Sequence, residues 1–574
     1  MIVPQPFASH GGASVKTTFK YDHYYKYAEL ESNLKKLQKK YPDLVTVEAN
    51  CVTPEGRKQY VVTLTNKKTG DALSKPGWYL DGNIHAGEVT ASMAAMHTID
   101  YVVTNYGEDE TCTALLDDMT IYVIPRVTPD GAETYLSTPY SLRSANRPFK
   151  PKEGGIKQED IDGDGVIRMM RIPTKYGAWK IDPKDSSTMT LRDPGDRFGT
   201  FYDVYPEGYL EDFDGSENMK LKKPEWGLDF NRNFPFGWYP DPRTPGAGQY
   251  PLCNPETKAQ ADFVIAHPNI CGAAIGHTFG GLIMYVPGTR KSKSAPASDI
   301  QALKTIAQMC VEEMDYIPMN LFDTFIHDQE QYDSGAFDDW MYETQGIPAY
   351  TIEFWNMAKK AGCPLDWEKH REEEPWEEIK RFNACMKWVK ENVPQYYKDW
   401  EPYDHPTFGK VEIGGFNYKF TYQNPPEHML LQECENDTRF NIRFALSAPK
   451  LVIDSLEAEQ LKAGLYKVTA VVGNIGYLPT NVSEQANILK VSKPVEVCIE
   501  GGELFSGKAC EEIGSLEGYS GTDTGIHFYG NISTTKSAKA KKKISWVVSA
   551  KKGTMITVCA KNPKAGTASA SIKL

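Results

Sequence analysis

The sequence predicts an α/β protein whose open, mixed and mostly parallel sheet carries helices on both faces, followed by a C-terminal all-β sandwich. Strand-like runs alternate with amphipathic helices over the first 395 residues or so. Alternating strands separated by turns replace that pattern toward the C-terminus. The chain has 574 residues, of which 40% are hydrophobic and 24% charged, so we expect a soluble protein of two or three domains.

The alternation begins with an amphipathic helix at 24–40, whose apolar face carries Leu30, Leu34 and Leu37. The elements expected after it, in chain order, are strands at 44–49, 59–65 and 76–81, a helix at 88–105, strands at 120–124 and 270–276, a helix near 297–314, a strand at 348–354 and a helix near 370–393. Ligands of such sheets bind beyond the carboxyl ends of the strands. Polar residues that end these strands are therefore candidates for a functional site.

The expected organisation has four segments. Residues 1–18 form a polar, flexible N-terminal segment, and residues 19–400 form the α/β domain. An insertion at about 148–227, rich in Asp, Gly, Pro and aromatic residues, interrupts that domain with little periodicity. A loop of that length without a function is uncommon. Residues 405–574 form the β-sandwich, which we interpret as immunoglobulin-like.

The sandwich prediction depends on alternation of apolar and polar residues. Phe440, Ile442, Phe444 and Leu446 alternate with polar neighbours, which predicts a strand, and the run from 495 to 499 has the same pattern. The sequence does not indicate what the sandwich binds, so its partner is unknown.

Composition argues against two function classes and bears on the compartment. The net charge of −12 argues against nucleic-acid binding, and no apolar run is long enough to span a membrane. Residues 1–18 lack a basic segment followed by an apolar one, which predicts a cytoplasmic protein as printed, or a secreted or periplasmic one if a leader was removed. Cys271 and Cys498 lie in apolar strand-like runs and are interpreted as reduced core residues, which favours the cytoplasm.

His85 and Glu88 follow the predicted strand at 76–81 and open the next helix. An imidazole and a carboxylate three residues apart can share one cation, and His₂Glu is a usual ligand set of catalytic zinc. The alternative is a surface histidine beside a helix N-terminal glutamate, which the helix dipole favours without a metal. A metal site would need a third ligand.

His277 ends the apolar strand at 270–276 and is the best candidate for the third ligand. The rival is His97, but it lies inside the helix that follows Glu88 and is better interpreted as structural. Glu353 ends another hydrophobic strand, between Ile352 and Phe354. Partial desolvation would raise the pKa of that carboxyl, which suits a general base, and an ordinary salt bridge is the alternative.

Two loop segments carry fixed positive charge. Asn231 and Arg232 combine amide donors with a planar guanidinium, which matches a carboxylate through two parallel hydrogen bonds. Arg143 lies in a second loop. Arginines in separate loops need not share a site. Whether Arg143 and Arg232 act together therefore depends on the other candidate site residues.

The joint motif set resembles the zinc metallocarboxypeptidases, the family of the pancreatic-type carboxypeptidases and their bacterial relatives (peptidase family M14), over roughly residues 20–395. The matching positions are His85, Glu88, Thr128-Pro129-Asp130-Gly131, Arg143, Asn231-Arg232-Asn233, His277, Tyr332 and Glu353. The resemblance implies one Zn²⁺ per chain, held by His85, Glu88 and His277. It implies that Glu353 activates the water and that Arg143 polarises the scissile carbonyl and stabilises its oxyanion. It also implies that Asn231 and Arg232 bind the terminal carboxylate of the substrate and that Tyr332 closes over it.

Three positions depart from the family pattern. Gly87 stands where many members carry Arg, and Phe279 where many carry Tyr, which leaves the preferences upstream of the scissile bond open. Thr128 replaces the more usual Asn without a clear catalytic consequence.

Two further hypotheses concern specificity and a second metal. Asp338 matches the position where basic-specific carboxypeptidases place an aspartate, which predicts a preference for C-terminal Lys or Arg, or for the amine of a cell-wall diamino acid; internal pairing of Asp338 is the alternative. Asp160, Asp162 and Asp164 form the first half of an EF-hand-like loop and predict Ca²⁺ binding. The closing Glu is missing because Arg171 occupies its position, so an acidic turn without calcium is the alternative.

The sequence thus predicts a zinc-dependent metallocarboxypeptidase that removes C-terminal residues from peptides with a free C-terminus. A cell-wall peptide hydrolase or zinc deacylase on the same scaffold is the alternative enzyme. An inactive peptide- or glycan-binding protein is the alternative of a different class.

Overall fold

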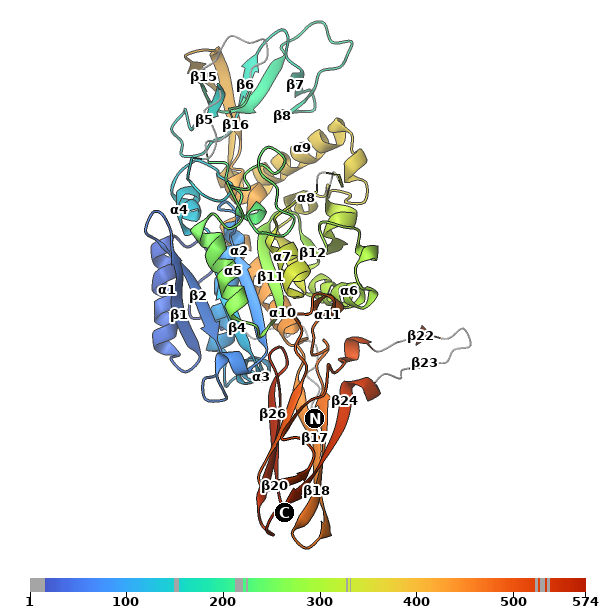
Figure 1. Cartoon of the computed structure of the whole chain (residues 1–574). Coiled ribbons are helices and arrows are strands. Elements are labelled where there is room, and N and C mark those ends of the chain that lie inside the picture. The colour runs from blue at the N-terminus through green and yellow to red at the C-terminus, as the bar shows by residue number, and fades with distance from the viewer. Residues whose placement is uncertain are drawn as a thin grey trace.

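The structure is a computed structural model that describes residues 16–148, 154–211, 220–222, 226–326, 329–330, 332–521, 525–526, 532–533 and 537–574. Residues 1–15 of the expected flexible segment lie outside the described residues. Figure 1 shows an α/β domain in the middle of the molecule, a smaller β-sheet beyond one end of it and the β-sandwich beyond the other.

The α/β domain is built on one mixed sheet of eight strands. In sheet order they are β1 (Val45–Val52), β2 (Lys58–Leu64), β4 (Thr120–Ile124), β3 (Gly77–Gly82), β11 (Ile270–Thr278), β14 (Ala349–Phe354), β12 (Leu282–Tyr285) and β13 (Ile317–Asn320). The central strands β4, β3, β11 and β14 are parallel, whereas β1, β2 and β12 pair antiparallel with a neighbour. This order confirms the predicted mixed, mostly parallel sheet.

Helices cover both faces of this sheet (Figure 1). The helices of the α/β domain are α1 (Tyr27–Lys40), α2 (Val89–Thr104), α3 (Glu110–Asp118), α4 (Pro129–Ser137), α5 (Pro255–Ala266), α6 (Ala297–Met314), α7 (Phe337–Gln345), α8 (Met357–Lys360), α9 (Pro375–Asn392) and α10 (Glu427–Ala445). Neighbouring residues of a strand point to opposite faces. Trp78 of β3 packs edge-on against Phe444 of α10, and Tyr79 packs against Phe337 of α7, so α10 and α7 lie on opposite faces.

Small residues let α2 approach the carboxyl ends of the central strands. A Cβ added to Gly82 of β3 would lie 2.5 Å from the carbonyl oxygen of Ala91, and one added to Gly276 of β11 would lie 2.8 Å from the Ala91 Cβ. Real Cβ atoms do not approach neighbours so closely, because close-packed interiors leave no such space. The two glycines therefore bring the start of α2, with Glu88 at its N-cap, next to β11 and His277.

The predicted insertion at 148–227 forms strands rather than an irregular loop. They are β5 (Gly155–Gln158), β6 (Met169–Pro173), β7 (Trp179–Asp182), β8 (Asp185–Leu191), β9 (Tyr202–Pro206) and β10 (Gly208–Glu211). Four of them join a later hairpin, β15 (Tyr397–His405) and β16 (Gly409–Phe416), in a six-stranded sheet of order β15-β16-β6-β9-β7-β8. We call this sheet the accessory sheet. The hairpin that completes it lies across the expected boundary at 400–405.

The predicted strand at 440–446 is wrong, because these residues belong to helix α10. Phe440, Ile442 and Phe444 are buried, but so are Asn441 and Ala445 between them. The helix has a solvent face at Glu427, His428, Leu431 and Gln432, but within 440–445 only Arg443 is not buried, so this short window lacks the 3.6-residue polarity pattern. The end of α10 packs into the hydrophobic core of the α/β domain, and the strands of the sandwich begin only at Leu451.

The C-terminal sandwich consists of two antiparallel four-stranded sheets that share one core. One contains β17 (Leu451–Lys462), β18 (Leu465–Asn474), β24 (Lys541–Ser549) and β20 (Glu503–Ser506); the other contains β21 (Cys510–Glu512), β19 (Glu496–Glu500), β25 (Met555–Asn562) and β26 (Gly566–Lys573). Inward-facing Val468, Trp546, Val497 and Val558 fill the space between the sheets. The predicted β-sandwich is therefore confirmed, and its immunoglobulin-like topology stays a prediction.

Cys498 is not a reduced core cysteine as expected, because it forms a disulfide with Cys510. The two residues are directly opposite each other where β19 pairs antiparallel with β21, which brings their Cα atoms to 4.0 Å. Cys271 is free and buried, as expected. The cysteine argument for a reducing compartment therefore does not hold for the Cys498–Cys510 pair.

Contacts from the sandwich side of the chain reach the α/β domain. Asp299 of α6 accepts the backbone N–H groups of Glu484 and Gln485, at the start of α11 (Glu484–Ile488). Lys564, in the turn between β25 and β26, donates to the carbonyl oxygen of Ile270 at the start of β11. Across the described part of the chain, the helices are too short or too polar to cross a bilayer.

Candidate metal centre and substrate pocket

The structure brings together the three predicted metal ligands, although the third is 189 residues from the second. His85 lies in the loop after β3, Glu88 is the N-cap residue of α2, and His277 is the next-to-last residue of β11. Because β3 and β11 are neighbouring parallel strands, the loop after β3 and the end of β11 meet at the same edge of the sheet. All three side chains are buried.

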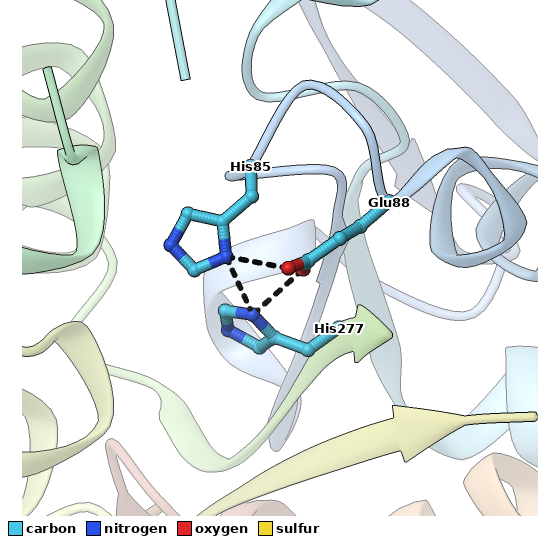
Figure 2. Close-up of side chains that lie close together, drawn as sticks. All are labelled: His85, Glu88 and His277. Atoms are coloured by element: carbon cyan, nitrogen blue, oxygen red, sulfur yellow. Dashed lines mark hydrogen bonds and ion pairs between the residues drawn. The ribbon is translucent and has the colours of Figure 1, made fainter. Parts of the chain in front are cut away.

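The potential ligand atoms point toward one another (Figure 2). The Nδ1 atoms of His85 and His277 lie 3.1 Å apart, and each lies 2.9 Å from a carboxylate oxygen of Glu88. Zinc bonds of about 2.0–2.1 Å put the ligand atoms of a tetrahedral site roughly 3.3 Å apart. Two imidazole nitrogens and one carboxylate that converge at this spacing fit a zinc ion.

The charges of the cluster keep Glu88 ionised. Burial alone would raise the pKa of Glu88, but the two imidazoles outweigh it and hold that pKa well below its usual value. Burial and Arg143 oppose protonation of His85, whereas the carboxylates of Glu88 and Asp229 prevail and raise its pKa. Glu88 is therefore an ionised carboxylate, which is the form that a metal-binding carboxyl group must take.

Asp229 orients the first ligand, and the sequence analysis assigned it no role. Its Oδ1 lies 3.0 Å from Nε2 of His85, so the other ring nitrogen, Nδ1, faces Glu88 and His277. A carboxylate behind a ligating histidine fixes the tautomer and the ring orientation. Asp229 lies two residues before Asn231, in the same motif. This position was the only signal in the sequence that could have indicated its role.

His97 lies elsewhere, as expected of a structural residue. It is buried in α2, and its Nδ1 lies 2.7 Å from the hydroxyl oxygen of Thr438 in α10. Burial lowers the pKa of His97 to about 3, so it is neutral at physiological pH.

Glu353 lies in β14, directly opposite His277 of β11 in the parallel register. One of its carboxylate oxygens, Oε2, is buried and has no hydrogen-bond partner among the residues that the structure describes. Burial and the nearby Glu88 carboxylate raise the pKa of Glu353 well above its usual value. Beside the predicted metal ligands, the charge of a bound zinc ion would lower this pKa again, and the resulting carboxylate could accept and return a proton.

Arg143 reaches the cluster from the loop after α4. Its Nε donates to Asp229 Oδ2 at 3.0 Å, and an NH1 nitrogen lies 3.4 Å from Glu88 Oε1. Nevertheless, 45% of the side-chain surface remains accessible, because the guanidinium lines an open pocket. The carboxylates fix its orientation while part of the positive charge faces that pocket.

That pocket, which we call the substrate pocket, has a volume of about 170 Å³ and brings together most of the predicted site residues. Those that line it are His85, Arg143, Asn231, Arg232, His277, Asp338 and Glu353. The Oδ1 of Asn231 accepts the N–H of Phe337 at 2.9 Å, and Arg232 is paired with Asp333 at 2.9 Å.

Tyr332 is not among the described residues that line the substrate pocket. Its ring lies 6.4 Å from that of Phe322, and the guanidinium of Arg243 lies 6.0 Å from its centre. The structure therefore does not bring Tyr332 to the metal ligands, and closure over a substrate would require it to move.

Asp338 and its neighbour Asp339 are buried side chains of α7 that line the substrate pocket. The Oδ2 of Asp338 accepts the hydroxyl of Thr351 at 2.7 Å, and Oδ1 of Asp339 accepts the N–H of Gly288 at 2.7 Å. Both donors are neutral, so these hydrogen bonds leave the negative charge of the pair uncompensated. Burial and the Asp338 carboxylate raise the pKa of Asp339 well above its usual value.

The acidic loop of the insertion has a fourth carboxylate nearby. Ligand atoms of Asp160, Asp162 and Glu207, the last from the connection between β9 and β10, lie within 4.8 Å of one another. However, the ammonium of Lys398 lies 2.7 Å from Asp162 and 3.2 Å from Asp164. Lys398 already supplies positive charge there, so calcium binding stays a prediction. Measuring the unfolding temperature with and without added Ca²⁺ tests it.

The fold and this site together define an α/β protein with a His₂Glu metal-ligand set. The chain belongs to the zinc carboxypeptidase family, Peptidase_M14, whose model matches residues 30–372. A second model, for a domain of unknown function (DUF8731), matches residues 450–573, which is the sandwich.

Sequence relatives match only part of the chain. Human carboxypeptidase D is 25% identical over 111 residues, which are 19% of this chain and 8% of that protein. Pig carboxypeptidase A1 is 30% identical over 127 residues, which are 22% of this chain and 29% of that protein. The matched region thus spans less than a third of each of these two relatives.

Solved structures align with a larger share of this chain. Bovine thrombin-activatable fibrinolysis inhibitor, in complex with tick carboxypeptidase inhibitor, covers 74% of this chain and 97% of its own, at 16% identity and a TM-score of 0.40. Carboxypeptidase A from Helicoverpa armigera covers 65% of this chain and 76% of its own, at 19% identity and a TM-score of 0.38.

Proposed function

We propose that this protein is a zinc-dependent exopeptidase that removes the C-terminal residue from peptides with a free C-terminus. The observation that carries the proposal is the shared substrate pocket, in which His85 and His277 lie together with Asn231 and Arg232. An exopeptidase needs a binding site for the terminal carboxylate at a fixed distance from the reacting bond. A planar guanidinium next to an amide suits that carboxylate.

The proposed mechanism divides the work among residues of the pocket. His85, Glu88 and His277 would hold the zinc ion, which supplies Lewis acidity and lowers the pKa of water. Arg143, held by Asp229, would donate hydrogen bonds to the carbonyl oxygen of the bond as negative charge develops there.

Glu353 would act as the general base. Its unpartnered Oε2 would accept a proton from the attacking water and deliver it to the leaving amine. Asn231 and Arg232 would bind the substrate's terminal carboxylate, for which Arg232 would exchange its present partner Asp333. Tyr332 would swing from its present position to cover the bound peptide.

We further propose a preference for C-terminal Lys or Arg. Asp338 and Asp339 give one side of the substrate pocket a buried negative charge. The hydrogen-bond donors to these two carboxyl groups, Thr351 and the backbone of Gly288, are neutral. A cationic side chain would compensate this charge, and the amine of a diamino acid in a cell-wall peptide would do the same. The carboxylate-binding pair favours an exopeptidase over a zinc deacylase on the same scaffold. The unpartnered Glu353 favours an enzyme over an inactive binding protein.

The test is mass spectrometry of one peptide ending in arginine, offered with a free and with an amidated C-terminus. We expect the zinc-loaded protein to shorten the free form by one residue, to leave the amide intact and to lose activity with a chelator. Equal cleavage of both forms, or cleavage at an internal bond, would contradict the exopeptidase function. Release of an acyl group without loss of a residue would favour the deacylase.

A further inference from the structure

A second cavity, of about 580 Å³, lies between the α/β domain and the accessory sheet. Its volume is within the range of roughly 300–1,000 Å³ that is typical of ligand sites. Four stretches of the chain form most of its wall: the end of α4 with the loop after it, residues 165–169, which lead into β6, helix α9, and residues 416–420. We call it the upstream cavity.

The wall of the upstream cavity is mainly apolar. Its apolar side chains include Leu136, Val166, Ile167, Phe382, Met386 and Phe416. The cationic residues of the wall are occupied elsewhere. Lys419 donates to the carbonyl oxygens of Tyr135, Thr138 and Tyr140 at 2.7–2.8 Å, and Arg168 is paired with Asp164 at 3.0 Å. The cavity therefore suits an apolar or aromatic group rather than an anion.

The upstream cavity adjoins the metal centre on the side of Arg143. Ser141 lines the upstream cavity, and Arg143, two residues later in the same loop, lines the substrate pocket. Tyr418 also belongs to its wall, and Tyr418 is close enough to the centre for the charges of Glu88 and Arg143 to act on its phenol. Among the described residues, the two cavities share no lining residue, so they are separate compartments next to one centre.

The absence of a side chain at Gly87 lets the segment that follows β16, with Gln423 and Asn424, approach the predicted metal centre. A Cβ at this position would lie 2.8 Å from Nε2 of Gln423 and 2.9 Å from the ring of Tyr135. The side chain of Asn424 donates to the carbonyl oxygen of Gly87 at 2.8 Å. The segment that follows β16 therefore covers the loop between His85 and Glu88, in space that a larger residue at 87 would occupy.

We propose that the upstream cavity binds apolar or aromatic side chains of the substrate residues that precede the cleaved bond. This inference rests on the proposed exopeptidase function. With the C-terminal residue in the substrate pocket and the bond beside Arg143, the preceding residues continue past Tyr418 at about 3.3 Å per residue. The accessory sheet then contributes to specificity, because Met169 of β6, Phe416 of β16 and residues 165–168, which lead into β6, line the cavity.

The test fills the cavity and varies only the upstream residues. Ile167 lines the cavity, is half-buried and has no role in the proposed chemistry, so Ile167→Trp fills the cavity and Ile167→Leu is the volume-conserving control. Two peptides end in the same Ala-Arg, one preceded by two phenylalanines and the other by two glycines. We expect the parent and Ile167→Leu to prefer the phenylalanine peptide at least tenfold in kcat/KM.

Ile167→Trp should lose this preference and cleave the glycine peptide as the parent does. Equal kcat/KM of the parent for both peptides, or an unchanged preference in Ile167→Trp, would overturn the proposal while leaving the exopeptidase function intact. Affinities of the same peptides, measured by calorimetry on Glu353→Gln with and without Ile167→Trp, give a second readout. If the phenylalanine peptide binds more tightly but the parent cleaves neither peptide, the cavity assignment stands and the proposed enzyme function is refuted.

Discussion

Replacement of Glu353 by glutamine is expected to lower kcat by about 10³-fold, near the middle of the range of general acid–base catalysis. That loss corresponds to about 4 kcal/mol in the activation barrier. Glutamine keeps the shape of the side chain but cannot accept the proton, and the buried Oε2 of Glu353 has no other described hydrogen-bond partner. Steady-state kinetics on an arginine-terminated peptide, together with the zinc content of the variant, measure the effect.

The matched control for Glu353→Gln is Asp437→Asn. Asp437 is a buried carboxyl group of α10 that forms no ion pair with a described residue and has Asn441 as its polar neighbour. Burial raises the pKa of Asp437 to about 8, so this group is already mostly neutral at pH 7 and the amide should be tolerated. Full activity of Asp437→Asn and a zinc-replete, inactive Glu353→Gln support the assignment. A zinc-replete Glu353→Gln with more than a tenth of the parent's kcat would remove Glu353 from the mechanism.

Replacement of Asp338 by asparagine is expected to lower kcat/KM for arginine-terminated peptides by about 100-fold, or about 2.7 kcal/mol. The variant leaves the substrate's cation buried without its partner, while the hydrogen bond with Thr351 can be retained. For phenylalanine-terminated peptides kcat/KM should stay the same or rise, because no cation is buried. Competition between the two peptides in one reaction measures the ratio directly.

Asp339→Asn is the control for Asp338→Asn, one residue away in the same pocket. The raised pKa of Asp339 favours its neutral form, so asparagine at this position should change the ratio less than asparagine at position 338 does. Equal losses for both peptides in Asp338→Asn would indicate a structural role for Asp338. A parent without preference for arginine over phenylalanine would refute the basic specificity.

The convergence of His85, Glu88 and His277 could be predicted because local patterns indicate each of them. His85 and Glu88 are three residues apart at a strand–helix turn, and His277 ends an apolar strand. Parallel strands bring their carboxyl ends together, so the sheet prediction carried most of the information about the site. The predicted helices and strands of the α/β domain correspond to elements of the structure with ends that differ by a few residues, as is usual where helix ends fray.

The rest depends on contacts that no short pattern encodes. In residues 440–445 of helix α10 every residue except Arg443 is buried, so this short stretch lacks the helical polarity pattern and alternates like a strand. The hairpin β15–β16 joins a sheet whose other strands lie about two hundred residues earlier. The Cys498–Cys510 disulfide follows from strand register, and the upstream cavity forms only where the accessory sheet meets the α/β domain.

The most direct test of the account is the metal content of the purified chain, measured by inductively coupled plasma mass spectrometry for the parent and for His277→Ala. The account predicts one zinc per parent chain and almost none in the variant, because loss of one imidazole leaves only two of the three ligands. Circular dichroism of both proteins establishes that the variant is folded. A folded His277→Ala that retains one tightly bound zinc would contradict the assignment of His85, Glu88 and His277 as the metal centre.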